Sequence, residues 1–588
     1  YQFIRIYVAS KEGHEIRWGW TSKRWGDKVY FPSGGINLIN DGKVHIYPFA
    51  LKFPDKENPI FDICDKICIE VKGSSGESNV ELLKVELVPY DKPYPRQLTL
   101  GSVCMDVLWD DTMVFAKKVE EGTDLIFHTG IYNPVLGAYK KFSEGKDWET
   151  DGISFSINVK ADEVTETIYQ GEMRPQMKEE DRIWKRTVLN LNKYAGKELE
   201  LIFQMDSLEN PIGDFGVWGN PMLVSSINKD TYSQEYPHFF IISCDTLRPD
   251  HLLPYGYHLP TSPNLDAFAK DAVVFENAYT TQTFTPVAHM SILTGRYPEN
   301  HGLTRNTDVH PYVETLPEVM RNYGYITGGF VGFLWWFIPS RGFARGMDLF
   351  SIPEEGRVGN RRSVIEVCEE AKDWIIKNET QKLFVFMHNY DVHSKAYGDF
   401  IYDAEEDEFK VFSSGLTRPK NGYIGCENIS LSGSLFTYLA TGDVFPVEEE
   451  IDYLRALYDD CVYKVDYALG DFFSFLKEKG LYDSAFIAVV SDHGESLGEH
   501  GLYGHDNVYE ESMRNVTIIK FPGNKHAGLR VKHRVILEDL MPTILEILNK
   551  RNGRALDGIS LLDIISNKPT KRPIFSSSLR GDMRAVIK

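Results

Sequence analysis

Three apolar runs in the second half of the chain lead into residues that can bind a metal ion. The residues that follow the runs FFIIS, FVFM and IAVVS are Asp245, then His388, Asp391 and His393, then Asp492, His493 and His505. Carboxylates together with imidazoles suit Zn²⁺ or Mn²⁺, and Ca²⁺ or Mg²⁺ is compatible with the carboxylates. Because ligands of open α/β sheets bind beyond the carboxyl ends of the strands, we expect one or two divalent ions here. His388 falls inside the apolar pattern of its run, so we expect it in the core.

A hydroxyl group could serve the same site. The stretch TFTPVAHMSILTG, residues 283–295, places Thr285 directly before a proline at the start of a helical pattern. Threonine is a good N-cap and Pro286 suits the first helical turn, so Thr285 could simply cap the helix. Backbone N–H groups and the helix dipole also favour an anion at this position, which would suit a nucleophile. His289 lies one turn further along the same face, so it would touch either the substrate or the core.

The region from residue 237 to 588 alternates apolar runs with amphipathic helical segments. This alternation predicts an α/β fold, a mainly parallel sheet with helices on both faces. The clearest helix is expected over 448–480, and a shorter one is expected to start after Ser262. Residues 399–445, rich in Gly, Ser, Asp and Glu, read as an insertion at the rim.

The region from residue 1 to 230 has a different pattern. Its apolar stretches are short and are separated by clusters of Gly, Asn, Asp and Pro, without a long helical segment. This pattern predicts an all-β sandwich of the jelly-roll kind. We interpret it as an accessory domain that either binds carbohydrate or acts as a spacer.

Net charge, apolar run length and cysteine content limit the kinds of partner and the cellular location that we expect. The 588 residues are 42% hydrophobic, and the formal net charge of −21 argues against nucleic acid as a partner. The longest apolar run, GGFVGFLWWFI, is shorter than the roughly 20 residues of a membrane span. Seven scattered cysteines and the lack of a signal peptide favour a cytoplasmic location, although localisation stays open because the chain starts at Tyr1 without methionine.

Four stretches resemble the sulfatase branch of the alkaline phosphatase superfamily. They are SCDTLRPDHLLPYGY, TSPNLDAFAKDAVVFENAYT, LTGRYPENHGL and SDHGESLGEHGLYGH. The resemblance runs from about 237 to 588 and implies an alkaline-phosphatase-like catalytic domain there. The chain stops about where such proteins begin a small C-terminal subdomain, so we expect that part to be missing.

The resemblance implies roles for individual residues. It makes Asp245, Asp492 and His493 metal ligands and Thr285 the nucleophile. True sulfatases carry a Cys or Ser that becomes formylglycine in a Cys-x-Pro-Ser-Arg pattern, whereas this chain has TPVAH from Thr285 to His289. Threonine has a methyl group on Cβ and cannot become the aldehyde, so the formylglycine mechanism is not expected.

In having threonine at this position, the chain resembles phosphodiesterases and transferases of phosphoethanolamine or phosphoglycerol. His393 and His505 match histidines of those proteins and would hold a second metal or protonate the leaving oxygen. Asp391 is either a further ligand or a helix cap. We therefore expect a metal-dependent hydrolase or transferase of phosphate mono- or diesters, acting on a small molecule or a glycan-linked ester.

Two other functions remain open from the sequence. One is a sulfuric ester hydrolase that works without formylglycine. The other is a glycan-binding protein whose catalytic domain has degenerated. The sequence does not separate hydrolase from transferase, and it carries no signal for the oligomeric state.

Overall fold

The computed structural model describes most of the chain after residue 111 and, before it, the strands alone. The described residues are 3–10, 15–21, 36–37, 44–50, 66–72, 80–88, 96–100, 103–108, 112–131, 150–162, 164–208, 216–225, 237–310, 312–333, 335–353, 361–394, 402, 409–416, 447–550, 554, 556–566, 572–578, 581 and 583–587. The chain divides into two compact units, Tyr1–Pro95 and Arg96–Lys588.

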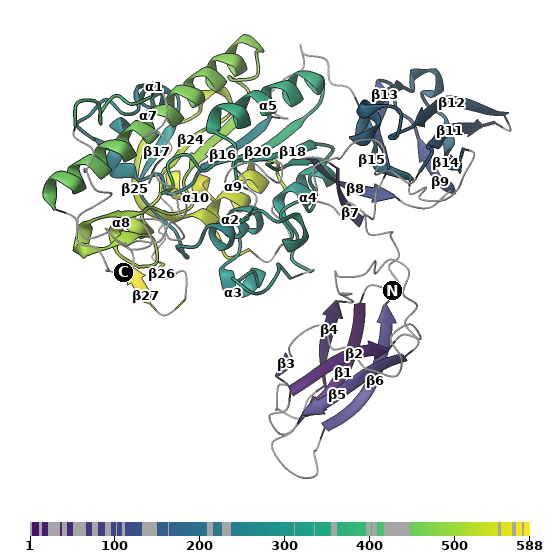
Figure 1. Cartoon of the computed structure of the whole chain (residues 1–588), viewed down its shortest axis with the longest axis horizontal. Helices are drawn as coiled ribbons and strands as arrows, with labels where there is room; N and C mark the ends of the chain where they lie inside the picture. The colour runs from purple at the N-terminus through teal and green to yellow at the C-terminus, as the bar shows by residue number, and fades with distance from the viewer. Residues whose placement is uncertain are drawn as a thin grey trace. The chain divides into compact units, whose positions relative to one another are not determined.

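The first unit is built from antiparallel strands. Strand β1 (Phe3–Ser10) lies between β4 (Val44–Ala50) and β6 (Val80–Val88). In a second sheet, β2 (Glu15–Thr21) lies between β3 (Ile36–Asn37) and β5 (Lys66–Lys72). These two three-stranded sheets are drawn in purple in Figure 1.

The second unit starts with a β-sandwich. One layer is an antiparallel sheet in the order β12 (Val164–Met173), β11 (Ile153–Ala161), β14 (Glu198–Ser207) and β9 (Thr112–Lys118). The other layer contains β13 (Lys185–Asn190), β10 (Thr123–Ile131) and β15 (Gly216–Ser225). Between them Trp218 is fully buried, with its ring 5.0–5.4 Å from those of Phe127, Phe155 and Phe203. The all-β sandwich predicted from the sequence is therefore present in this part of the chain.

The sandwich layer continues into a long sheet of the α/β region. Strand β8 (Val103–Leu108) pairs with β7 (Arg96–Leu100) along most of its length, with β15 at its carboxyl end and with β19 (Leu349–Ser351) at its amino end. The sheet then runs β18 (Ile326–Val331), β20 (Leu383–Asn389), β16 (Phe239–Cys244), β21 (Phe486–Val490), β24 (Thr517–Lys520), β17 (Val273–Tyr279) and β25 (Arg530–Ile536). The central strands from β19 to β21 are parallel.

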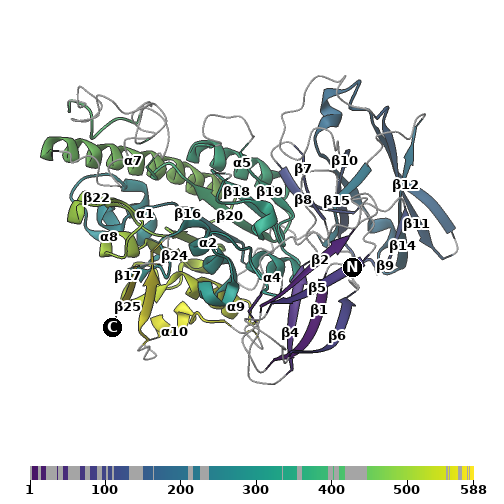
Figure 2. The same ribbon diagram turned by 60° about the horizontal axis from the view of Figure 1, so that its bottom comes forward.

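Helices cover both faces of this sheet. Alternate residues of β16 enter two cores, with Phe240 and Ile242 on one face and Phe239 and Ile241 on the other. The first face carries α1 (Pro263–Lys270), α5 (Val364–Lys377) and α7 (Glu448–Glu478); the second carries α2 (Thr285–Thr294), α4 (Leu316–Asn322), α9 (Leu540–Ile547) and α10 (Leu561–Ile565). Figure 2 shows α5 and α7 on one side of the strands and α2, α9 and α10 on the other. The α/β fold predicted from the alternating pattern is confirmed.

Two features differ from the sequence expectation. The pattern predicts one sandwich over residues 1–230, whereas the first compact unit ends at Pro95 and one of the two sheets that follow it continues into the long sheet. Alternation along a strand reveals which face is buried but not which strand it pairs with, so the sequence pattern does not predict the boundary between the two compact units. Helix α1 follows Ser262 as expected, yet the carboxylate of Asp466 in α7 accepts the N–H groups of Asn264 and Leu265 in place of a serine cap.

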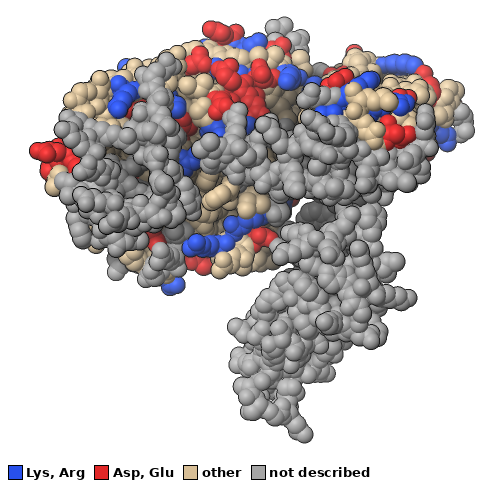
Figure 3. Space-filling model, in the orientation of Figure 1, with Lys and Arg blue, Asp and Glu red and all other residues tan. Residues whose placement is uncertain are grey.

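The outer surface of the α/β region is charged. Figure 3 shows acidic side chains gathered along the outer helices α5 and α7, with basic side chains between them. Most of the expected insertion at 399–445 lies outside the described residues. Among the helices that the structure describes, none is long and apolar enough to cross a membrane.

Candidate active site

Asp245, Asp492 and His493 lie together beyond the carboxyl ends of β16 and β21. One ligand atom from each residue lies within 4.8 Å of the others, and all three side chains are fully buried. Asp492 Oδ1 accepts the backbone N–H groups of Thr246 and His493 at 3.2 and 2.9 Å, which fixes the carboxylate. The fold thus brings together the three residues that the sequence analysis put forward as ligands from two separate strands.

The electrostatics of this triad fit a divalent cation. Asp245 Oδ1 and Asp492 Oδ2 are buried and accept no hydrogen bond from any residue that the structure describes. Burial, and then the charge of Glu495, raises the pKa of Asp245 well above its usual range, and burial with the charge of Asp245 raises the pKa of Asp492 to about 7. Burial lowers the pKa of His493 to about 4, so its imidazole is neutral. Two crowded carboxylates and a neutral imidazole are a donor set that a divalent ion stabilises.

The backbone around the triad is unusual in two places. Thr246 has a φ of 56°, a left-handed conformation that costs a β-branched residue free energy and that recurs at functional sites. Its N–H group points at Asp492 as a result. A Cβ on Gly494 would lie 2.0 Å from the backbone oxygen of Glu511, so only glycine fits directly after His493.

Thr285 is the first residue of α2, and its hydroxyl faces the triad. Phe284 holds the N-cap position, so the capping role considered for Thr285 is not the one it takes. Its Oγ1 lies 3.3 Å from Nε2 of His493, and the hydroxyl partly counteracts the rise that burial causes in the pKa of Asp245. The side chain is buried, and it stands at the amino end of a ten-residue helix, where the dipole favours an anion.

His393 and His505 form a second cluster of nitrogen atoms. Their Nδ1 atoms donate to the carbonyl oxygens of Ser394 and Thr283 at 2.5 and 2.9 Å. With those protons assigned, both Nε2 atoms present lone pairs, and they face each other at 3.2 Å. Burial lowers both pKa values, that of His505 to about 4. Such a pair can hold a proton or a second cation between its nitrogens.

Two further histidines lie behind the triad. His289 is fully buried, donates from Nδ1 to the oxygen of Thr285 at 2.7 Å and accepts from Ser243 at 2.8 Å. It therefore fixes α2 against β16, in the core rather than on an open surface. His388, expected in the core, is fully buried but has its Nε2 3.3 Å from Oδ2 of Asp245, so it orients that carboxylate.

Asp391 has contacts that are not those of the triad. Its carboxylate accepts the N–H of Val364 at 2.7 Å, at the start of α5, and lies 3.2 Å from the ammonium of Lys464. Of the two roles considered for it, these contacts match the cap of a helix.

Glu495 is a further buried carboxylate, in the loop that follows His493. It accepts the hydroxyl groups of Tyr402 and Ser394 at 2.7 and 2.9 Å, and burial raises its pKa to about 7. Tyr402 comes from the segment expected as an insertion at the rim. Glu495 therefore ties that segment to the loop that follows His493.

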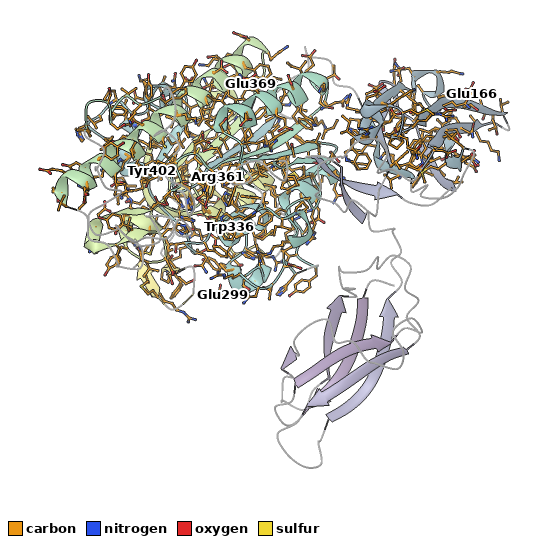
Figure 4. The ribbon with its side chains drawn as sticks, in the orientation of Figure 1. Glu166, Glu299, Trp336, Arg361, Glu369 and Tyr402 are labelled. Carbon is orange, nitrogen blue, oxygen red and sulfur yellow. The ribbon has the colours of Figure 1, made fainter. Side chains whose placement is uncertain are left out.

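A cation and several aromatic rings adjoin the histidine pair, and the sequence reading singled out none of them. The guanidinium of Arg361 lies over Tyr390, with its carbon 4.4 Å from the ring centre, and the Tyr390 ring stacks on His393 at 4.1 Å. Phe333 stacks on the same tyrosine at 4.4 Å, and Trp336 packs on Phe284, next to the nucleophile candidate. Figure 4 labels Arg361, Trp336 and Tyr402, which come from three separate segments.

Comparison with known proteins gives a family match. A model of the sulfatase family matches residues 237–550, more than half of the chain. The multifunctional alkaline phosphatase superfamily protein PehA of Trinickia caryophylli is 42% identical over 125 residues, 21% of this chain and 24% of PehA. An arylsulfatase of Clostridium perfringens is 25% identical over 386 residues, 56% of this chain and 79% of that protein. The chain thus spans about a quarter of the first relative and about four fifths of the second.

Two solved structures are also similar to part of this chain. The phosphonate monoester hydrolase SpPMH from Silicibacter pomeroyi is 21% identical, with a TM-score of 0.42 over 58% of this chain and 79% of the other. The protein yidJ from Bacteroides fragilis, described as a putative sulfatase, is 19% identical, with a TM-score of 0.46 over 59% of this chain and 83% of the other.

Proposed function

Since the chain belongs to the sulfatase family, we propose that it is a metal-dependent hydrolase of phosphate mono- or diesters with Thr285 as its nucleophile. The observation that carries the proposal is the position of the Thr285 hydroxyl at the amino end of α2, 3.3 Å from His493 Nε2. A divalent ion held by Asp245, Asp492 and His493, with Zn²⁺ or Mn²⁺ the best match to these donors, would lower the pKa of that hydroxyl.

The residues of the site can carry both steps of such a reaction. Oγ1 of Thr285 forms a bond to phosphorus while the bond from phosphorus to the leaving oxygen breaks. The proton that Thr285 loses is taken up between the Nε2 atoms of His393 and His505 and passes to the leaving oxygen. Water then attacks the phosphothreonine and gives a proton to the same nitrogens, the bond from phosphorus to Oγ1 breaks, and that proton returns to Oγ1 as phosphate leaves. An acceptor alcohol in place of water would make the reaction a transfer.

Phosphorus suits a threonine better than sulfur does. A hydrated aldehyde can release a bound sulfate by collapsing back to the carbonyl, whereas a threonine ester has no such route. Phosphothreonine can be cleared by attack of water at phosphorus. Hydrolysis of sulfate esters is the second candidate, because the Clostridium perfringens relative that matches 56% of the chain is an arylsulfatase.

The test is an activity panel on metal-loaded protein. We expect turnover of 4-nitrophenyl phosphate or bis(4-nitrophenyl) phosphate, partial activity for Thr285→Ser, and a loss of at least about a thousandfold for Thr285→Ala. Mass spectrometry after a short incubation with an aryl phenylphosphonate would find the phenylphosphonyl group on Thr285. If Thr285→Ala matches wild type on phosphates and sulfates, Thr285 is not the nucleophile.

The same panel separates the remaining functions. Turnover of 4-nitrophenyl sulfate alone would favour the sulfatase. Protein that binds no metal and turns over no ester, but binds glycans, would favour the degenerate glycan-binding protein. The proposed carbohydrate role of residues 1–230 is tested by glycan-array binding of the full chain.

A further inference from the structure

Among the residues that the structure describes, those next to Thr285 carry little positive charge. Helix α2, which begins at Thr285, contains no lysine or arginine. Burial lowers the pKa of His393 and of His505, so neither contributes a fixed charge. The triad itself brings two carboxylates. Because these two carboxylates offset the charge of one divalent ion, a negatively charged phosphoryl group would be stabilised by a further cation from elsewhere in the fold.

Arg361 is a cation held beside the histidine pair. Its guanidinium carbon lies 4.4 Å from the centre of the Tyr390 ring and 5.2 Å from that of Phe333. The Tyr390 ring stacks in turn on His393 at 4.1 Å with an angle of 17°. A guanidinium stacked on a ring keeps its N–H groups in its own plane, so they point past the edge of the ring, where an oxyanion can accept them.

The backbone fixes this arginine against the edge of the sheet. Arg361 forms an isolated antiparallel bridge with Phe333, Arg362 donates its N–H to Gly332 at 2.8 Å, and Gly332 donates to His388 at 2.8 Å. His388 is the residue that orients Asp245. Hydrogen bonds thus tie the segment that carries Arg361 to β20, the strand next to β16 in the sheet. Asp245 directly follows β16.

The charge of Arg361 reaches both halves of the site. Burial raises the pKa of Asp245, and Arg361 counteracts that rise. Burial lowers the pKa of His393, and the charges of His505 and Arg361 lower it further. Arg361 is also partly exposed, whereas Asp245, Asp492 and His493 are fully buried.

We infer that Arg361 binds a non-bridging oxygen of the substrate's phosphoryl group and favours dianionic monoesters over monoanionic diesters. The inference rests on the proposed function and adds a residue that sets its substrate class. A monoester has one more negative charge than a diester at this position, and the attraction to a fixed cation grows with that charge.

The neighbouring residue Arg362 does not share this role. Its guanidinium pairs with Glu370 and donates to the backbone oxygens of Val331 and Ser351 at 2.7 and 2.9 Å. These contacts build the junction of β18, β19 and α5. Two adjacent arginines therefore differ in what they touch, one the rings beside the site and the other the frame of the fold.

The first experiment measures kcat/KM of metal-loaded Arg361→Met, Arg361→Lys and wild-type protein. We expect Arg361→Met to lose about 10- to 100-fold with 4-nitrophenyl phosphate and several-fold less with bis(4-nitrophenyl) phosphate. Arg361→Lys keeps the charge without the planar fork and should fall between them. Added guanidinium chloride should restore part of the activity of Arg361→Met, which a purely structural role would not allow. Equal losses on both esters without guanidinium rescue would overturn the inference.

The second experiment measures binding of inorganic phosphate to metal-loaded protein by calorimetry, without turnover. We expect Arg361→Met to bind phosphate about 10- to 100-fold more weakly than wild type. Arg305→Met removes one positive charge from an exposed loop and should bind phosphate as wild type does. If Arg361→Met is unfolded by thermal melting, Arg361→Lys takes its place, and a dissociation constant equal to that of wild type overturns the inference. If wild type turns over no ester, the proposed function fails, and phosphate binding still decides the role of Arg361.

Discussion

The two halves of the site are built in different ways. The ligand half, Asp245, Asp492, His493 and Thr285, is buried, and its residues follow directly on strands or open a helix. The arginine half, Arg361 with Tyr390, Phe333 and Trp336, is assembled from loops and held by ring stacking. The ligand half fits a metal ion and the attacking oxygen, whereas the arginine half fits the phosphoryl group of the substrate. Variants of the ligand half should therefore lose metal affinity and activity, whereas variants of the arginine half should lose affinity for phosphate.

The largest effect is expected in the ligand half. Asp245→Asn removes a ligand oxygen and one of two crowded buried charges. We expect metal affinity and activity to fall by at least about a hundredfold, while the metal-free protein melts at a higher temperature because a like-charge repulsion is gone. Metal analysis and thermal melting with and without Zn²⁺ or Mn²⁺ check both signs.

Asp391→Asn is the matched control for a buried carboxylate. It breaks the pair with Lys464 and weakens the bond to Val364, so we expect lower thermal stability with metal content unchanged. Loss of the metal in Asp391→Asn would mean that this residue is a ligand after all.

The next largest effect concerns the histidine pair between the two halves. His505→Gln removes one of the two facing nitrogens, so the proton for the leaving oxygen is lost. We expect kcat to fall about 10²- to 10⁴-fold with alkyl phosphates, whose leaving groups need a proton, and far less with 4-nitrophenyl phosphate. Equal losses with both leaving groups would mean that the pair does not act as the acid.

Replacing each of the two neighbouring arginines by methionine should give smaller effects, and the two variants should differ in what they lose. Arg361→Met should keep the melting temperature near that of wild type and weaken phosphate binding, whereas Arg362→Met should lower the melting temperature and leave phosphate binding in the folded fraction intact. The physical reason is that Arg362 pairs with Glu370 and bonds two backbone oxygens of the fold. A common pattern of loss in both variants would erase the distinction between the arginine half and its support.

The smallest effect is a pH dependence of stability in metal-free protein. Burial and the charge of Asp245 raise the folded-state pKa of Asp492 from 3.8 to about 7. Between these values the folded state keeps a proton that the unfolded state has lost, so the free energy of unfolding falls as pH rises from about 4 to 7. The difference between wild type and Asp492→Asn isolates this trend from the buried histidines. A difference that is flat between pH 4 and 7 would contradict it, and added metal should abolish the trend.

The sequence predicted the ligand half far better than the arginine half. Asp245, Asp492 and His493 each follow a strand whose apolar run is visible, so their edge of the sheet could be foreseen. His388 was expected in the core because it continues the apolar pattern, and burial alone does not reveal that its ring faces Asp245. Nothing local marks Arg361, since its place depends on a bridge to Phe333 and on a ring from a different strand end.

The same limit applies to the fold. The helix expected over 448–480 appears as α7, Glu448–Glu478, because its periodicity is a local property. The pairing of β8 with β19 joins residues about 250 positions apart and leaves no local trace. Pairing across such a distance is a property of the whole chain.

That pairing constrains how the chain can be shortened. A variant that begins at residue 237 would lack β8 and would expose the edge of β19. The backbone N–H and C=O groups on that edge would then have no neighbouring strand to pair with. Such an edge is a template for strands of other molecules, so the truncated protein should self-associate even with its metal-ligand residues intact. The shortest fragment expected to stay monodisperse begins no later than Arg96, where the second compact unit starts.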